Sequence, residues 1–426
     1  MDLTLISQLA GHIVRRVPEI VIPTTVGGLL FWAVMILVWS QYRRLATMER
    51  RIHGFVRNDP WSSTGTALVF GVGAGVIGSL LLVTLGITLS PDDIIYLWPV
   101  ALVLLLVNPR LLCFSYAGGL VSVVHLVTGW PPAVNPAAIM GLVAILHLME
   151  GVLVAINGYG VASAVYLRNG RRDVVGGYLI QRFWPIPIMI IFLLQVPPES
   201  IASGFSMPDW WPLIGTGGDL GPNWAYVMTP VVAALGYSDI ALTEMPSRRA
   251  RRTALQLVVF SVALLGLSLA AGRWGGWVWA AALFGPVAHE LMIRHSSGRE
   301  MDGEPRFLTG PGGVMVMDLR PGEPGEKMGL RPGDVIRKVN DIEVTTREGL
   351  RQAVVASGWY LELGVLGPGG GEHTLESNRH PPGRSLGLVT APEPGDDPHV
   401  NLGGSGPLGR LGKRMWRRIR GRRPRT

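Results

Sequence analysis

The sequence predicts a polytopic α-helical membrane domain of about nine spans, followed by a small α/β domain and a basic tail. Three observations support this fold class. Apolar residues make up 48% of the 426 residues and charged residues only 16%, against roughly 25% charged residues in soluble proteins. Uncharged runs such as residues 66–89 exceed the ~20 residues that cross a bilayer. Beyond residue 293 the chain becomes polar and rich in glycine and proline, and its last residues are rich in arginine.

Each predicted span is an apolar run bounded by polar or turn-forming residues. Two runs, 94–107 and 183–196, are shorter than the others. The membrane domain as a whole is expected over residues 20–293. Its runs lie near residues 20–39, 66–89, 94–107, 111–129, 136–157, 183–196, 224–242, 253–271 and 274–293.

The distribution of arginine predicts how this domain is oriented. Cytoplasmic loops collect arginine and lysine, and basic and non-basic joints alternate along the chain. The alternation places the N-terminus outside and the C-terminal portion in the cytoplasm. Arg15 and Arg16 then fall on the outer side, so we expect residues 1–19 to lie on the membrane as an interfacial segment. The basic joints are at residues 43–57, 110, 168–182, 247–252 and from 294 onward.

The stretch "AHELMIRH" (288–295) resembles the outline of a zinc-protease motif. Such a motif, His-Glu-x-x-His, puts two histidines one helical turn apart so that both face one metal. Here His289 and His295 stand about 120° apart around a helix. We therefore expect no catalytic site, no metal site and no cofactor. The single cysteine, Cys113, excludes an internal disulfide and a cysteine-based metal cage.

Four ionisable residues fall within the predicted spans, where unpaired charge is costly. His147 and Glu150 share a helix face, and Asp239 and Glu290 lie toward the cytoplasmic ends of their spans. One interpretation is hydrogen bonding between helices. The alternative is that these residues are the working groups of a hydrolase or transporter within the membrane.

Residues 306–392 have the pattern of a small α/β module. "VMVMDL" and "VIRKV" are strand-like, and Thr345 or Thr346 caps a helix that runs to about Ser357. The run from Gly313 to Asn340 resembles a bacterial PDZ domain, after a linker over residues 294–305. The motif residues are Gly313, Gly329, Leu330, Pro332, Gly333, Asp334 and Asn340.

PDZ domains bind an extended peptide along a sheet edge. If this domain is circularly permuted, as bacterial versions often are, the stretch "SLGLV" supplies the ligand strand beside the predicted helix. The alternative is an edge strand without a ligand. The candidate peptide-binding residues are Ser385, Leu386, Gly387, Leu388 and Val389, with Leu350 and Val354 on the helix.

A flexible linker over residues 393–409 precedes the basic tail, residues 410–426. Leu411, Met415, Trp416 and Ile419 recur there at helical spacing among basic residues. Such a segment suits the anionic cytoplasmic leaflet of a membrane. A solvated tail is the alternative, and no nucleic acid is expected as a partner.

Several phrases together resemble the MinJ family of cell-division topology proteins. They are "NPRLLCFSYAGGL", "GGYLIQRFWPIPI", "GYSDIALT", "LFGPVAHELMI" and the PDZ motif. The resemblance implies a non-enzymatic scaffold at the cell membrane, septal or polar, that bridges a DivIVA-like protein to the MinC–MinD inhibitor of division. The alternative is a PDZ-regulated intramembrane protease or a transporter-like protein.

Overall fold

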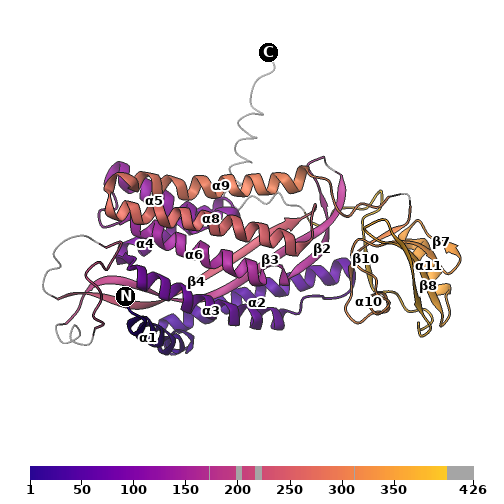
Figure 1. Ribbon diagram of the computed structural model, residues 1–426, viewed down its shortest axis with the longest axis horizontal. Coiled ribbons are helices and arrows are strands. Elements are labelled where there is room, and N and C mark those ends of the chain that lie inside the picture. The colour runs from indigo at the N-terminus through magenta and orange to yellow at the C-terminus, as the bar shows by residue number, and fades with distance from the viewer. Residues whose placement is uncertain (172, 198–203, 216–222, 311, 401–426) are drawn as a thin grey trace, which may run out of the picture.

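The computed structural model has a long helical body with a small β-rich domain at one end (Figure 1). It describes residues 1–400 except 172, 198–203, 216–222 and 311, so the basic tail lies outside the described residues. The helices of the body are α1 (Leu3–Val21), α2 (Val26–His53), α3 (Pro60–Leu85), α4 (Pro91–Val107), α5 (Phe114–Thr128), α6 (Pro136–Asn157), α8 (Pro246–Arg273) and α9 (Val278–Asp302).

Helix ends follow local signals in the sequence. Proline stands at the first turn of α3, α4, α6 and α8, where its missing N–H costs nothing. Ser90 and Asp93 form a capping box at the start of α4, which satisfies two otherwise free amides. Gly86 ends α3 in the left-handed conformation, with φ of 64°, as glycine permits.

Within the described residues, four helices are long and apolar enough to cross a membrane, namely α2, α3, α8 and the stretch Pro136–Gly160 that contains α6. The predicted count of about nine spans is therefore not supported. The runs 94–107 and 111–129 form α4 and α5, of 17 and 15 residues. The run 274–293 lies in α9, which continues to Asp302 and carries charged residues in its second half.

The predicted helices at 183–196 and 224–242 are wrong, because both runs are β-strands. β3 (Val174–Gln195) and β4 (Trp224–Ala241) pair antiparallel along their full shared length. β2 (Ala162–Arg168) pairs with β3 near its start, and β1 (Thr88–Leu89) pairs with it in parallel near its end. An apolar run alone does not distinguish a buried strand from a helix. Pro185 and Pro187 within the run disfavour a helix.

A strand inside an apolar body needs its backbone groups satisfied, and α2 and α3 contribute to this for β3. Residues 182–190 of β3 pair with a strand, β4, on one side only. On the other side Tyr42 Oη of α2 lies within hydrogen-bond distance of both the amide and the carbonyl of Phe183. On that side a Cβ added to Gly71 or Gly75 would overlap the carbonyl oxygens of Pro185 and Pro187. The two prolines have no amide hydrogen to satisfy. The next amide on that edge, Met189 N–H, donates to Ser79 Oγ at 2.8 Å.

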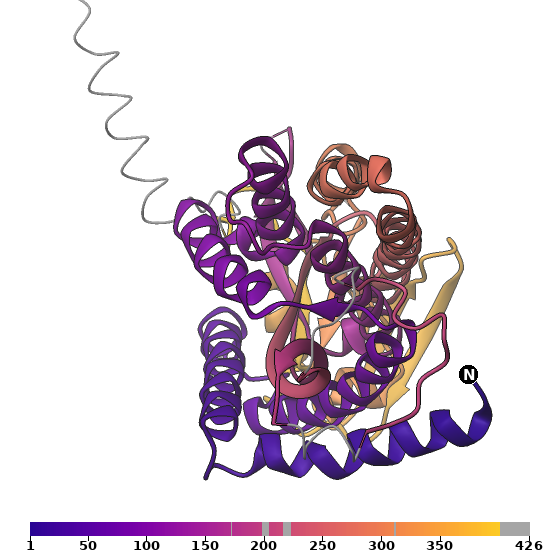
Figure 2. The same cartoon turned by 90° about the vertical axis from the view of Figure 1, so that its left-hand side faces the viewer.

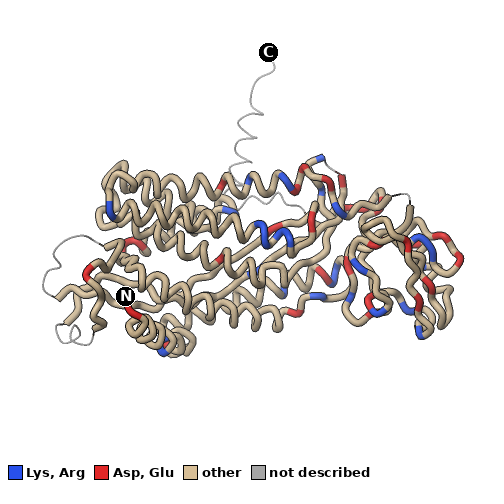
Figure 3. Tube along the Cα trace, in the orientation of Figure 1, with Lys and Arg blue, Asp and Glu red and all other residues tan. Residues whose placement is uncertain are grey.

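Helix α1 runs across the other helices rather than along them (Figure 2). Leu9, Ile13 and Ile20 are buried on its inner face, while Arg15 and Arg16 are exposed. An interfacial position for residues 1–19 stays a prediction. Lysine and arginine gather toward the β-rich end of the molecule and are sparse in the opposite half (Figure 3).

The C-terminal domain is a six-stranded sheet with two helices. Its strands lie in the order β10-β5-β6-β8-β9, with β7 beside β6. Its core contains Leu350 and Val354 of α11 together with Leu386. The elements are β5 (Val314–Leu319), α10 (Pro324–Lys327), β6 (Val335–Val339), β7 (Ile342–Glu343), α11 (Arg347–Ala356), β8 (Leu361–Leu366), β9 (Glu372–Ser377) and β10 (Leu388–Thr390).

Candidate functional site

The motif residues of the C-terminal domain build its turns. Gly329 and Gly333 have φ of 97° and 100°, and Asn340 has φ of 51°, a region that favours glycine and asparagine. Asp334 is buried and accepts the Arg331 amide at 2.8 Å. Gly313 approaches the Ile336 carbonyl too closely for a side chain, Leu330 is buried, and Pro332 precedes Gly333 in the turn.

The predicted ligand strand is the edge strand of the sheet. β10 pairs antiparallel with β5, with Leu388 opposite Leu319 and Val389 opposite Asp318. Gly387, at φ of 71°, ends the loop that leads into β10, and Ser385 in that loop is exposed. The strand therefore occupies the position expected of a permuted PDZ domain. Peptide binding by these residues stays a prediction.

The outer edge of β10 is available at one residue. The Gly387 carbonyl accepts Arg320 N–H, and Ala391 N–H donates to the Met315 carbonyl, so both point toward β5. Backbone directions alternate along a strand, which turns the N–H and C=O of Leu388 outward. Among the described residues, no backbone group pairs with this outward edge of Leu388.

The side chains predicted to line a peptide groove are mostly in the core. Leu350 and Val354 on α11 are 5% and 3% exposed, and Leu386 is 4% exposed. Val389 is buried against the helical body instead, within its large apolar cluster. Leu388 is half-buried and packs on the core of the C-terminal domain. A bound peptide would therefore contact the backbone edge of β10 and the Leu388 side chain rather than these buried side chains.

The helical body contacts the C-terminal domain at Thr390 of β10. Tyr166 Oη of β2 donates to the Thr390 carbonyl at 2.8 Å, and Arg347 of α11 donates to the same hydroxyl at 3.1 Å. Tyr178 Oη of β3 donates to the Met317 carbonyl on β5. The two domains therefore meet through the strands β2 and β3 on one side and β5 and β10 on the other.

An ion pair between Arg57 and Asp318 crosses the same interface. Asp318 is 5% exposed, whereas the Arg57 side chain is 38% exposed. Burial raises the pKa of the Asp318 carboxyl, and the neighbouring Arg57 guanidinium opposes that shift. Removing Arg57 would leave a buried carboxylate without its counter-charge, a costly arrangement.

The predicted intramembrane polar residues contact different partners. Asp239 accepts two hydrogen bonds of 2.8 Å from the buried guanidinium of Arg249. Glu290 accepts Tyr116 Oη at 2.6 Å and the Arg294 guanidinium at 2.6 Å. Glu150 forms no ion pair with any described residue. Glu290 thus links α9 to α5, whereas Asp239 lies on a strand and links β4 to α8. The role of these residues stays a prediction.

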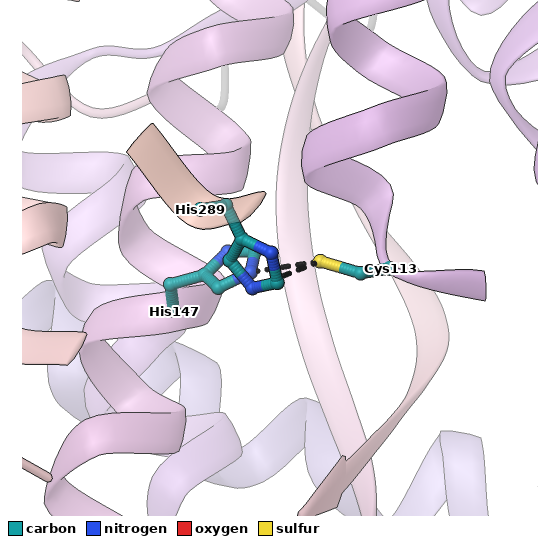
Figure 4. A group of neighbouring side chains, drawn as sticks. All are labelled: Cys113, His147 and His289. Atoms are coloured by element: carbon teal, nitrogen blue, oxygen red, sulfur yellow. Dashed lines mark hydrogen bonds between the residues drawn. The ribbon is translucent and has the colours of Figure 1, made fainter. Parts of the chain in front are cut away.

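His147 belongs to a cluster that the sequence analysis did not predict. Its Nε2 lies 3.0 Å from Cys113 Sγ, and the Nε2 of His289 lies 3.7 Å from the same sulfur (Figure 4). The three side chains come from the start of α5, the middle of α6 and the middle of α9. Together they could hold a metal ion, although we expected no metal site. His295 is exposed and takes no part.

A signal for this cluster was present in the sequence. Cys113 begins the run 111–129 and His289 lies near the end of the run 274–293, so the arginine pattern places both toward the cytoplasmic face. The spacing rule for zinc motifs considers one helix at a time. It therefore excluded the pair His289 and His295 without testing partners on other helices.

Comparison with known proteins finds similarity to a domain family and to a cell-division protein. A PDZ-domain family model matches residues 315–358. The cell division topological determinant MinJ of Bacillus subtilis (strain 168) is 24% identical over 200 residues, which is 46% of this chain and 46% of that protein. The match thus covers less than half of either chain. No solved structure matches. The predicted resemblance to MinJ is confirmed as a similarity over part of the chain, and residues 315–358 match a PDZ-domain model.

Proposed function

We propose that this protein is a non-enzymatic membrane scaffold whose PDZ domain recruits cytoplasmic division proteins. The observation that carries the proposal is the outward backbone edge of Leu388, on the edge strand of a PDZ domain. PDZ domains use such an edge to add a peptide strand, with backbone hydrogen bonds supplying the affinity. The printed name of the similar protein, a cell division topological determinant, supports division as the process.

The finer proposal is that the protein crosses the membrane several times and bridges a DivIVA-like protein to a MinC–MinD-type inhibitor at the septum or poles. The concentration of basic residues near the PDZ end supports a cytoplasmic position for that domain (Figure 3). The predicted contact of residues 410–426 with anionic lipids is retained as part of the proposal.

The enzyme alternative has weaker support. Hydrolysis would need a general base placed beside the other working groups. Glu290 and Asp239 are each engaged by arginine, and Glu150 forms no hydrogen bond or ion pair with the other three groups among the described residues. The polar residues named for that alternative also belong to different hydrogen-bonded groups. We therefore propose that the protein has no catalytic activity of its own.

The substitution Leu388→Pro tests the role of the edge strand. Proline removes the one outward N–H that a bound peptide would use, and proline is tolerated on sheet edges. We expect this variant to lose septal or polar enrichment in dividing cells and to lose capture of DivIVA-like or MinD-like proteins.

The control is Leu388→Val, which keeps the amide and an apolar side chain at the same position. It should recruit partners as the wild type does. A second variant lacking residues 306–392 should lose every partner that depends on the PDZ domain. The proposal is wrong if Leu388→Pro, correctly folded, and the deletion both retain the partners and the cellular location of the wild type.

A further inference from the structure

In the cluster of Cys113, His147 and His289, both imidazoles are buried and the cysteine is half-buried. His147 is 3% exposed and His289 is 7% exposed. The ring of Phe260 on α8 packs on both imidazoles, with ring centroids 5.4 and 5.6 Å away. Tyr116 packs edge-on against His289 at 5.3 Å. Figure 4 shows both imidazoles directed at the sulfur.

The hydrogen bonds of His147 determine which ring nitrogen is free. Its Nδ1 lies 2.8 Å from the Val143 carbonyl, one turn earlier on α6. A carbonyl only accepts, so Nδ1 carries the proton and the neutral ring presents the Nε2 lone pair to Cys113. Histidines that bind metals commonly donate their second ring N–H to a carbonyl in this way.

Two imidazole nitrogens converge on one sulfur. A thiol can donate its proton to only one of them, so without a metal the other contact is a weak N–H to sulfur hydrogen bond. A cation between the three side chains would use the thiolate and both lone pairs at once.

The distances are close to those of a tetrahedral metal site. With Zn–S of about 2.3 Å and Zn–N of about 2.0 Å, tetrahedral ligand atoms lie about 3.6 Å apart for S and N. The observed separation from the sulfur is 3.7 Å for His289 and 3.0 Å for His147, and all three ligand atoms lie within 4.8 Å of one another. Metal binding would therefore require the Cys113–His147 separation to increase by about 0.6 Å.

We propose that Cys113, His147 and His289 bind one thiophilic d¹⁰ metal ion, Zn²⁺ or Cu⁺. A thiolate with two imidazoles is a donor set that these ions favour, whereas Mg²⁺ and Ca²⁺ prefer oxygen ligands. Binding releases the thiol proton to solvent, since the thiolate is the ligand. The ion joins the short helix α5 to α6 and α9, so it acts as an internal clamp of the membrane domain.

Elemental analysis of the full-length protein, purified in detergent or lipid nanodiscs, tests the proposal. We expect close to one Zn or Cu per chain. Cys113→Ser and His289→Ala should each lower metal affinity by on the order of a hundredfold or more, since removing even an outer-shell partner of a ligand costs about 10–100-fold. The matched control is His295→Ala, an exposed histidine on the same helix, which should retain the metal.

Spectroscopy and thiol labelling distinguish Zn²⁺ binding from Cu⁺ binding. Both use the wild-type protein, so a misfolded variant cannot account for their results. Co²⁺ added to metal-free wild type should give tetrahedral d–d bands and a sulfur-to-cobalt charge-transfer band, and Zn²⁺ should displace it. Cu⁺ binding is measured by competition with a chromogenic Cu⁺ chelator. Because Cys113 is the single cysteine, bound metal should slow its alkylation by a membrane-permeant maleimide at least tenfold.

Three results would overturn the proposal. They are metal content equal in wild type and Cys113→Ser, a cobalt spectrum without the sulfur band, and alkylation rates that neither metal ion changes. None of these outcomes bears on peptide recruitment at Leu388, because the cluster lies within α5, α6 and α9, away from β10.

Discussion

At the scale of single residues, two glycines on α3 decide whether the helical body can enclose a strand. Gly71 and Gly75 lie against the carbonyls of Pro185 and Pro187, with no room for a Cβ. Gly73, on the same helix, has open space around its Cα. The helix therefore needs glycine at only one of its faces, the one that contacts β3.

The pair Gly75→Ala and Gly73→Ala tests this close contact. Gly75→Ala forces a methyl group into the Pro187 carbonyl, and overpacking of this kind costs about 1–3 kcal/mol. We expect a lower melting temperature for Gly75→Ala, measured by thermal unfolding in detergent. Gly73→Ala should melt at or above the wild-type temperature, because alanine favours a helix. Equal melting temperatures for the two variants would contradict the packing of α3 on β3.

At the scale of elements, the segment after β10 holds the two domains together. Residues 391–400 return to β2, where the His399 ring stacks on Tyr166 with centroids 4.2 Å apart. The Tyr166 amide donates to His399 Nδ1 at 3.2 Å, and the His399 amide donates to the Tyr166 carbonyl at 2.8 Å. The first of these bonds requires a neutral imidazole, since a protonated ring has no acceptor.

This contact predicts a dependence on pH. Partial burial lowers the pKa of His399, and the charges of His53 and Arg347 lower it further, while Asp396 opposes them. A lowered pKa in the docked state means that protonation favours the undocked segment. Docking should therefore be complete above the ordinary histidine value of 6.5 and weaken as the pH falls below it.

Hydrogen exchange of the Tyr166 amide at pH 7.5 and pH 5.5 measures the effect. The control is His399→Asn, whose side-chain oxygen accepts a hydrogen bond but does not titrate. Relative to this control at the same pH, the wild-type amide should lose protection at pH 5.5 only. A constant ratio between the two proteins at both pH values would show that His399 does not control docking.

At the scale of the whole molecule, the two ends of the structure differ in charge. The basic residues gather at the PDZ end (Figure 3), and the turn between α8 and α9 lies at the opposite end (Figure 1). The two strands β3 and β4 cross the body and return, as two helices would. The strands β3 and β4 thus take the place of two predicted helices, and basic and non-basic loops still alternate along the chain.

Cysteine labelling tests the orientation that follows. Gly369 in the β8–β9 turn and Gly275 in the α8–α9 turn both have open surroundings. In a Cys113→Ala background, Gly275→Cys should react with a membrane-impermeant maleimide in intact cells. Gly369→Cys should react only after the membrane is permeabilised, because the PDZ domain is expected on the cytoplasmic side. Labelling of Gly369→Cys in intact cells would reverse the orientation.

The sequence by itself determined the PDZ domain, the apolar segments and the arginine asymmetry. These are local patterns: turn residues such as Gly333 and Asn340 impose their own backbone conformations, and a run of apolar residues is apolar in any fold. The same patterns predicted α11 almost to the residue, because Thr346 caps it through Gly349 N–H.

Only the tertiary structure decided three other features. Residues 183–195 lie in a strand because α2, α3 and β4 contact the backbone of β3, which no local pattern encodes. Cys113, His147 and His289 meet because α5, α6 and α9 pack together. Tyr166 reaches Thr390 because the domains dock. Each depends on contacts between residues far apart in the chain, and the periodicity of one segment carries no information about its distant partners.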